Sequence, residues 1–508
     1  MYFQKKVHFL FKFDFLLFFS KWSLKIVYVW YNYYGDNMNK TKIIATIGPS
    51  SNSKENLRKL MQKGMDVVRI NLSHASYSQC IDIVEKINEL NVELKTNVAI
   101  MFDTKGPDVR VGRFCGGEAC LNEGAKIRIY MDEIVGDSTK FSVSYPNLIN
   151  DVKYDTIIKL DSGLIELKVL DKGRDYLLCE VLSGGIIRDN RSLNVPNIHL
   201  NRAFLNKKDI EDIKFAHKMG GDFLALSFVE TAENILEVND LLIELEDDHM
   251  SIIAKIENET AVDEIDGILS VCDGVMIARG DLGVEIPMER IPGIQKMIVN
   301  KCLMAGKISI VATELMSSME CQIRPTRAEV SDVANAVLDG ADAVMLSGET
   351  TIGKYPIEAL STMEKIIASA ELDIDYMDLL DRAVRTEKQD ITGILAYNVA
   401  ESANRLKCKA IITPTVSGYT ARKISRFRPS CPIIAASPNI STVKSLALCF
   451  GVTPIVIDEL KTFDKIIDKA RDITKELIET EANDRIIITG GYPFKGVKHT
   501  NFMKIEEL

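Results

Sequence analysis

The sequence has little of what marks several common classes of protein. Its ten cysteines among 508 residues include no Cys-X-X-Cys pair and no zinc spacing with histidine, which favours reduced thiols in a cytoplasmic protein over a disulfide framework. Lysine and arginine number 62 against 72 aspartates and glutamates, giving a net charge of -10. A nucleic-acid partner held by bulk charge is therefore not expected. No low-complexity tract and no strict internal repeat follows residue 37.

Residues 1–37 differ from the rest, because they hold both tryptophans and are rich in aromatic residues. Lys12 and Asp14 interrupt their apolar stretch and Lys21 ends it, which leaves it shorter than the roughly 20 apolar residues of a spanning helix. No membrane association is expected. We interpret 1–37 as an extension outside the fold, with Met38 as the true start. Organelle targeting is the alternative, since two lysines precede the apolar stretch.

From Lys42 onward, short β-branched runs alternate with longer amphipathic stretches, which predicts an α/β protein built on a closed (β/α)8 TIM barrel. The barrel is expected to comprise residues 38–105 and 207–367. Thr326 and Glu329, three residues apart before an apolar-periodic stretch, predict a helix that starts with a capping box. The expected strands are 42–47, 66–72, 97–103, 222–228, 251–256, 273–278, 307–313 and 341–346.

Two further segments have different patterns. In residues 106–206 the helical pattern gives way to short alternating runs and glycine turns, which predicts a small β-barrel domain inserted in a barrel loop, placed to act as a lid. Residues 368–508 return to alternating helices and strands, which predicts a C-terminal open α/β domain of effector type.

Polar clusters stand at the expected carboxyl ends of the barrel strands, where barrel enzymes build their active sites. Arg69, Asn71 and Ser73 alternate along one strand, so their side chains point the same way. A guanidinium beside neutral oxygens can hold a phosphoryl group and a monovalent cation together. One exposed arginine at a polar strand end is the plainer alternative.

A second cluster indicates enolate chemistry. Lys255 and Glu257 share a face of one strand, and a lysine buried beside a carboxylate is costly as mere structure. The ammonium can neutralise an enolate oxygen, while Glu257 and Asp281 suit Mg²⁺. A structural salt bridge is the alternative, although it would need no Asp281. Thr313 ends the seventh strand and either orients a proton donor or is a turn residue.

A third cluster lies in the C-terminal segment. Thr415, Ser417, Gly418 and Thr420 follow a strand and open a helix. Hydroxyls and free backbone N–H groups there would cradle the phosphate of an effector, although an ordinary Ser/Thr-capped turn fits the same residues.

From Lys40 to the C-terminus the chain resembles pyruvate kinases. The resemblance implies transfer of the phosphoryl group of phosphoenolpyruvate to ADP, giving ATP and an enolate that is protonated to pyruvate. It also implies a homotetramer that uses Mg²⁺ and K⁺. The matching segments are KIIATIGPS at 42–50, RINLSH at 69–74, DTKGP at 103–107, IAKIE at 253–257, IARGDLG at 277–283 and RPTRAEVSDVAN at 324–335.

The resemblance also implies a role for each matching residue. Arg69 would hold the phosphoryl group and Lys255 would stabilise the transition state, with substrate contacts from Gly280, Asp281 and Thr313. Mg²⁺ would bind Glu257 and Asp281. The implied K⁺ ligands are Asn71, Ser73, Asp103 and the Thr104 carbonyl. The implied nucleotide contacts are Asn71, His74, Arg110 and Arg191.

Three positions depart from the family pattern. Arg191 stands where a nucleotide-contacting lysine is usual, in a segment, 191–197, that lacks the usual glycines. Asp108 replaces the glutamate of K⁺-dependent members, and Glu314 stands where glutamine is frequent. These departures bear on kinetic detail.

Two other functions compete with this one. A catalytically weak sensor that binds phosphometabolites through the C-terminal domain would be expected to have lost part of the set around Lys255. An aldolase or phosphoenolpyruvate mutase barrel predicts neither the inserted lid nor a nucleotide requirement.

Overall fold

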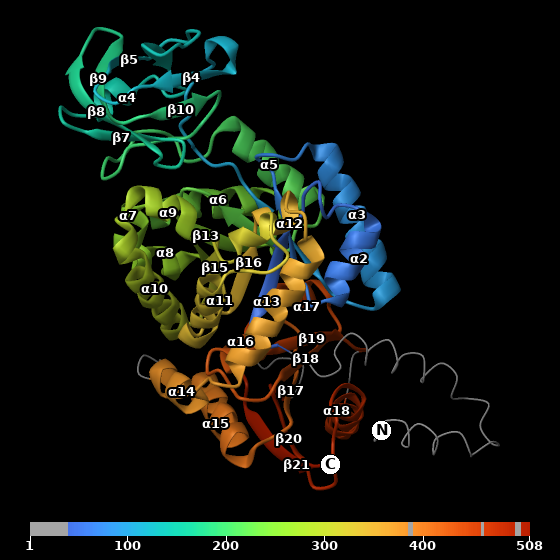
Figure 1. Ribbon diagram of the computed structural model, residues 1–508. Coiled ribbons are helices and arrows are strands. Elements are labelled where there is room, and N and C mark those ends of the chain that lie inside the picture. The colour runs from blue at the N-terminus through green and yellow to red at the C-terminus, as the bar shows by residue number, and fades with distance from the viewer. Residues whose placement is uncertain (1–38, 385–389, 459–461, 493–498) are drawn as a thin grey trace.

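The computed structural model describes residues 39–384, 390–458, 462–492 and 499–508. The extension expected at residues 1–37 lies outside this part of the chain. The described residues form a barrel, an all-β insert at one end of it and an α/β sheet at the other (Figure 1). No helix in these ranges is both long enough and apolar enough to cross a bilayer.

The predicted barrel is confirmed: eight parallel strands close in the order β1-β16-β15-β14-β13-β12-β3-β2. Every residue of β1, β3 and β14 is buried, as expected for parallel strands covered on both faces. The predicted strand ends are right to within one or two residues. The strands are β1 (Lys42–Thr46), β2 (Val67–Asn71), β3 (Ala99–Asp103), β12 (Phe223–Leu226), β13 (Ser251–Ile256), β14 (Gly274–Ala278), β15 (Ile308–Ala312) and β16 (Ala343–Leu346).

Helices between the strands form the outer layer of the barrel. The predicted capping box of α11 is present, because Thr326 Oγ1 accepts from Glu329 N at 3.2 Å and the Glu329 carboxylate accepts from Thr326 N at 2.7 Å. The helices are α2 (Lys54–Gln62), α3 (Tyr77–Leu94), α5 (Lys207–Lys218), α6 (Ala232–Glu244), α7 (Glu259–Asp263), α8 (Ile265–Val271), α9 (Arg279–Glu285), α10 (Ile291–Ala305), α11 (Arg327–Asp339), α12 (Gly348–Thr351) and α13 (Pro356–Glu371), with 3-10 turns at Met288–Arg290 and Ser317–Glu320.

Each of four aspartates links two neighbouring barrel strands at the amino ends of those strands. Each directly precedes one strand and accepts a backbone N–H from the neighbouring strand, and three of the four occur in a Gly-X-Asp sequence. The sequence therefore holds a weak threefold recurrence that was not recognised as a pattern. The bonds are Ile43 N to Asp66 at 2.8 Å, Ile100 N to Asp222 at 2.8 Å, Ile252 N to Asp273 at 2.9 Å and Ser309 N to Asp342 at 3.0 Å.

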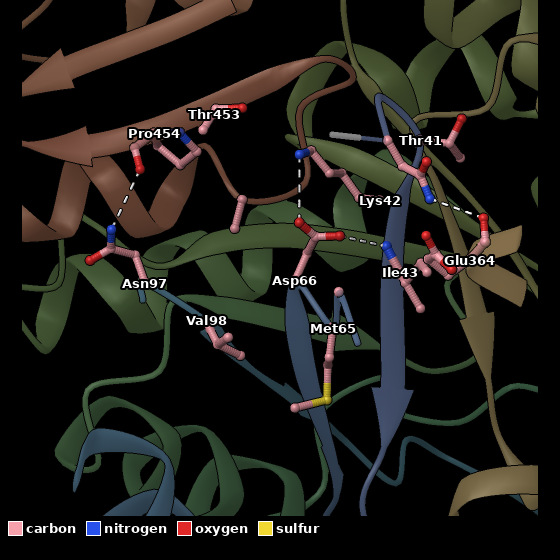
Figure 2. Close-up of a pocket in the computed structure, with 13 residues that line it drawn as sticks. Thr41, Lys42, Ile43, Met65, Asp66, Asn97, Val98, Glu364, Thr453 and Pro454 are labelled. Atoms are coloured by element: carbon pink, nitrogen blue, oxygen red, sulfur yellow. Dashed lines mark hydrogen bonds and ion pairs between the residues drawn. The ribbon is translucent and has the colours of Figure 1, made fainter. Parts of the chain in front are cut away.

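Three of these carboxylates also meet a cation. Figure 2 shows Asp66 between the ammonium of Lys42, at 3.5 Å, and the backbone of Ile43, beside a cavity of about 70 Å³. Asp222 pairs with Lys444 at 3.6 Å and Asp342 with Arg428 at 2.8 Å, and both cations come from the C-terminal segment. The base of the barrel is therefore where the C-terminal segment docks.

The insert is all-β, as predicted. Its six-stranded curled sheet has the order β11-β7-β8-β9-β5-β6, and β10 pairs with β4. Lys159 and Asn194 reach helix α9 of the barrel, at Val284 O (2.7 Å) and the Glu285 carboxylate (2.8 Å). Its elements are a 3-10 turn at Cys115–Gly117, β4 (Glu118–Leu121), β5 (Lys126–Tyr130), β6 (Lys140–Ser142), α4 (Leu148–Asp151), β7 (Ile157–Leu160), β8 (Ile165–Lys172), β9 (Tyr176–Ser183), β10 (Gly185–Arg188) and β11 (Leu193–Asn194).

The C-terminal segment forms an open five-stranded sheet in the order β19-β18-β17-β20-β21. The open α/β sheet agrees with the expectation. Four strands are parallel, and the antiparallel edge strand β21 was not anticipated. The elements are α14 (Tyr376–Val384), α15 (Ile391–Leu406), β17 (Ala410–Pro414), α16 (Tyr419–Ser425), β18 (Ile433–Ser437), α17 (Ile440–Ser445), β19 (Val452–Val456), α18 (Phe463–Leu477), β20 (Arg485–Gly490) and β21 (Phe502–Glu507).

Candidate functional site

Three barrel strands bring charged side chains together at their carboxyl ends. Arg69 of β2 donates from Nε to Asp103 Oδ2 at 2.7 Å and from Nη1 to Thr46 Oγ1 at 2.9 Å. Lys255 of β13 places its ammonium 3.4 Å from the other Asp103 oxygen. Asp103, at the end of β3, is 1% exposed. One buried carboxylate thus holds both of the cations that the sequence singled out.

The ammonium of Lys255 has two more partners. It lies 2.9 Å from Glu257 Oε1 and donates to Ser227 Oγ at 2.7 Å. Burial works to lower the pKa of Lys255, but Asp103 and Glu257 outweigh it and raise that pKa. Burial works to raise the pKa of Asp103, but Arg69 and Lys255 outweigh it and lower that pKa. The site therefore keeps a fixed ammonium beside a fixed carboxylate.

Glu257 and Asp281 have the chemistry of a divalent-cation site. Burial raises the pKa of Glu257, and the charge of Asp281 raises it further against the opposing effect of Lys255. The two carboxylates thus carry more negative charge than Lys255 offsets, which suits Mg²⁺. Among the residues that the structure describes, no three His, Cys, Asp or Glu side chains gather as a metal site. Mg²⁺ is usually held by one or two carboxylates together with substrate and water.

Thr313 lies in a left-handed turn directly after β15. Its φ is 63° and that of Glu314 is 55°, values that non-glycine residues rarely adopt. Thr313 Oγ1 accepts from Gly280 N at 2.8 Å and donates to Ala312 O at 2.7 Å. Arg279 donates to Thr313 O at 2.7 Å and pairs with Asp332. The predicted substrate contacts Gly280 and Thr313 therefore touch each other.

A cavity of about 540 Å³ opens beside Arg69. Asn71 and His74, two of the expected nucleotide contacts, line it together with Ile83, Thr351 and further residues of the β1 and β16 loops. It is large enough for part of a nucleotide. A ligand in this cavity would lie beside Arg69, the residue expected to hold the phosphoryl group.

The other two expected nucleotide contacts belong to the insert. Arg110 pairs closely with Asp108 and donates to Asn190 O at 2.9 Å. Arg191 lies 3.5 Å from Asp161. Neither lines the cavity beside Arg69. Asp108 also pairs with Lys105 at 3.1 Å and, with Glu257, lines the cleft between insert and barrel.

The expected K⁺ ligands lie at the ends of two neighbouring strands, where Asn71 pairs in register with Asp103. Asn71 Oδ1 accepts from Ser73 N at 2.9 Å, which forms a tight turn after β2. The Thr104 carbonyl accepts from Ser227 Oγ at 2.8 Å. These oxygens are the hard, neutral or anionic donors that an alkali cation prefers.

The expected effector residues form one turn between β17 and α16. Thr415 Oγ1 accepts from Gly418 N at 2.9 Å, and Gly418 adopts φ 76° at the start of α16. Thr420 is buried, and its hydroxyl is paired with Thr500 Oγ1 at 2.8 Å. Of the four expected effector residues, only Ser417 is exposed. The capped-turn alternative therefore accounts for the contacts of Thr415, and Thr420 already has a protein partner.

Two residues of this site, Ser227 and Arg279, were given no role from the sequence. Ser227 ends an apolar run without any charged neighbour, so no local pattern distinguishes it. Arg279 stands beside Gly280 and Asp281, but its guanidinium turns toward Thr313 O. A search of all polar residues within two positions of each predicted strand end would include both, without indicating what either contacts.

Comparison with known proteins agrees with this geometry. Residues 38–360 match the family model "Pyruvate kinase, barrel domain" and residues 394–506 match "Pyruvate kinase, alpha/beta domain". The chain is 43% identical over 468 residues to the pyruvate kinase of Geobacillus stearothermophilus, covering 92% of this chain and 80% of that one. It is 42% identical over 474 residues to that of Clostridium perfringens, covering 93% and 100%.

A solved structure gives the same result. The crystal structure of a pyruvate kinase from Cryptosporidium parvum superposes with a TM-score of 0.87 at 37% identity, over 92% of this chain and 96% of that one. With its barrel, insert and C-terminal sheet all accounted for, the chain belongs to the pyruvate kinase family.

Proposed function

We propose that the cluster around Lys255 at the barrel mouth carries out the pyruvate kinase reaction, transfer of the phosphoryl group of phosphoenolpyruvate to ADP. The observation that supports this most is the ammonium of Lys255, held between Asp103, Ser227 and Glu257. Phosphoryl transfer asks mainly for positioning and for positive charge. A lysine that is buried, charged and fixed by three partners meets both requirements.

Each side chain has one task in this proposal. Arg69, oriented by Asp103 and Thr46, holds the phosphoryl group while lining the adjoining cavity. Lys255 neutralises the charge that develops on the enolate oxygen as the phosphoryl group leaves. Gly280 and Thr313, held together by their hydrogen bond, contact the substrate near the carbon that is protonated.

Two cations complete the site. Glu257 and Asp281 would hold Mg²⁺, which when bound offsets the negative charge of the phosphoryl and enolate oxygens. Asn71, Ser73, Asp103 and the Thr104 carbonyl would hold K⁺. The nucleotide would occupy the cavity lined by Asn71 and His74, and Arg110 and Arg191 would reach it from the insert, acting as a lid.

The finer points of the assembly are also proposals. We expect a homotetramer, to be tested by light scattering, and a cytoplasmic enzyme, since all ten cysteines are free thiols.

A phosphorylated effector would bind at the turn 415–420. Because Ser417 alone of the four expected effector residues is exposed, Ser417→Glu is the sharper test of that site, and it should abolish activation by whichever sugar phosphate or nucleotide activates the wild type.

Lys255→Met tests the central assignment. We expect turnover to fall by about a hundredfold or more, with a small effect on the KM for phosphoenolpyruvate, since the ammonium acts on charge that develops in the transition state. A lactate dehydrogenase-coupled assay measures both constants. Lys42→Met is the matched control, because Lys42 is also a buried lysine paired with an aspartate, at the opposite end of the barrel.

Normal turnover by folded Lys255→Met would remove Lys255 from the mechanism. Failure of the wild-type chain to form pyruvate under any condition would instead favour the sensor.

We also expect the enzyme to need K⁺. The proposed cation ligands include Asp103, whose two oxygens already serve Arg69 and Lys255, so the cation adds positive charge beside the phosphoryl site rather than replacing either side chain. Activity should be low in tetramethylammonium buffer and rise on addition of KCl. Full activity without K⁺ or ammonium would contradict this.

A further inference from the structure

Ser227 lies at the end of β12, directly beside Lys255. It is 3% exposed, and its hydroxyl oxygen lies 2.7 Å from Lys255 Nζ, 2.8 Å from Thr104 O and 3.3 Å from Asp103 Oδ1. An ammonium can only donate, so Ser227 accepts from Lys255. Its single proton goes to the nearer acceptor, the Thr104 carbonyl. Both hydrogen bonds of the hydroxyl are therefore assigned.

Phe228, the residue after Ser227, holds Glu257, which is the carboxylate partner of Lys255. Phe228 N donates to Glu257 Oε2 at 2.7 Å, with Phe228 in the left-handed region at φ 56°. This backbone conformation is costly for a bulky residue and persists only where the surroundings impose it. Two consecutive residues of one loop thus fix Lys255 and Glu257 from the side of β12.

The surroundings that impose this conformation include Gly106. A Cβ on Gly106 would lie 2.7 Å from Ser227 O, and Gly106 itself has φ 68°. Its N–H donates to the buried Asp209 at 3.0 Å. Because Gly106 begins the insert, the loop that holds Lys255 packs against the connection between barrel and insert.

We propose that Ser227 is a positioning residue for phosphoryl transfer, which fixes the ammonium of Lys255 and ties it to the Thr104 carbonyl. The inference rests on the proposed function of Lys255. Without the hydroxyl, the ammonium has only Asp103 and Glu257 as partners, and both carboxylates draw it toward themselves and away from the substrate. A carbonyl oxygen has two lone pairs, so Thr104 O can accept from Ser227 and still ligate a cation.

The test is Ser227→Ala, assayed for kcat and for the KM of phosphoenolpyruvate at saturating Mg²⁺ and K⁺. We expect kcat to fall about ten- to a hundredfold, the scale of a misplaced catalytic group, with KM changed less than about twofold. Ser227→Thr keeps the hydroxyl and should recover most of kcat. Ser309→Ala is the matched control, because Ser309 is another buried barrel serine bonded to an aspartate, at the opposite end.

A purely structural role predicts that Ser227→Ala and Ser309→Ala both lose stability and keep kcat, and this result would overturn the inference. Equal loss of kcat in Ser227→Ala and Ser227→Thr would assign the effect to packing and would also overturn it. Lys255→Met, assayed in parallel, separates failure of the role of Ser227 from failure of the proposed role of Lys255. If it is inactive while Ser227→Ala is active, only the role of Ser227 falls. If Lys255→Met is itself active, both assignments fall.

Discussion

At the barrel mouth, the cationic side chains of Arg69 and Lys255 lie near three carboxylates, and their charges are not evenly balanced. The carboxylates are those of Asp103, Glu257 and Asp281. Asp103 meets both Arg69 and Lys255, which lower its pKa despite burial. Glu257 meets Lys255 but also senses Asp281, and its pKa is raised. Positive charge is therefore in surplus on the Asp103 side and in deficit on the Glu257 side. A divalent cation would correct the deficit where substrate phosphate would add further negative charge.

Arg69, Lys255 and Glu257 could be predicted from the sequence because alternation along a strand determines the direction of a side chain. Ser227 could not, since its importance comes from the parallel pairing of β12 with β13, which places it next to Lys255. A lone serine after an apolar run carries no information about its neighbour in the sheet. The same limit applies to Arg279, which donates to the Thr313 carbonyl in the turn after β15.

Asp247 offers a pH-dependent prediction away from the site. Its buried carboxylate accepts from His217 Nδ1 at 2.7 Å and lies 2.8 Å from His249 Nδ1. Burial works to raise the pKa of Asp247, but the hydrogen bonds from His217 and from the N–H groups of Met250 and His249 outweigh it and lower that pKa. A lowered carboxylate pKa stabilises the fold above the unfolded value, about 3.9, and this stability disappears as pH falls through the folded value.

We therefore expect Asp247→Asn to destabilise the protein by about 1–3 kcal/mol at pH 7, and the difference from wild type to shrink below about pH 4. Thermal midpoints at pH 7, 5 and 3.5 measure this. The neighbouring Asp248 is exposed, so Asp248→Asn serves as control and should match wild type throughout. A difference that grows toward low pH would have the wrong sign for this explanation.

Among the elements, type and order followed from the sequence better than boundaries did. Helix α16, Tyr419–Ser425, for example, ends where Arg426 and Arg428 turn into the domain interface, so long-range contacts set its boundary. The antiparallel strand β21 was missed because its residues, Phe502–Glu507, alternate weakly and carry three charges. Its position comes from pairing with β20 over six residues, a long-range contact that no local pattern records.

Substitution of Glu329 measures how much the capping box of α11 contributes to stability. Besides closing the capping box with Thr326, it accepts from Ser318 N at 2.7 Å and from Ser318 Oγ at 2.5 Å, so it ties α11 to the preceding turn. We expect Glu329→Ala to cost about 1–2 kcal/mol, somewhat more than loss of a simple cap. Differential scanning calorimetry measures the shift. Glu211→Ala, at an exposed site on α5, should leave the thermal midpoint within error of wild type. Equal shifts in both variants would show that the cap contributes no more than an ordinary surface residue.

Across the whole molecule, the two ends of the barrel have different roles: one carries the site residues and the other contacts the C-terminal segment. The carboxyl ends of the strands carry Arg69, Lys255 and the other site residues, and the insert lies over them. The amino ends carry the four aspartates, two of which receive cations from the C-terminal sheet. The Gly-X-Asp recurrence was visible in the sequence, but its purpose was not, since Lys444 and Arg428 lie about 220 and 90 residues farther along the chain.

Arg428 should be the strongest single contact at that base. It is 2% exposed, lies 2.8 Å from the Asp342 carboxylate, donates to Gly340 O at 3.0 Å and stacks over Phe450 at 4.6 Å. Arg428→Met leaves Asp342 buried without its cation, a change that typically costs about 3–5 kcal/mol. Arg428→Lys keeps the charge but loses the planar fork and the stack, so it should recover only part of that stability.

Lys444→Met is the matched comparison, because the Lys444–Asp222 pair is longer, at 3.6 Å, and Lys444 keeps a 16% exposed side chain that water can solvate. Its loss should lower the thermal midpoint by clearly less than the loss of Arg428 does. The midpoints of all three variants, followed by circular dichroism at one protein concentration, give the ranking. If Lys444→Met proved the more damaging, the docking of the C-terminal sheet would depend on Asp222 at the foot of β12, and Arg428 would be a buried ion pair with little net effect.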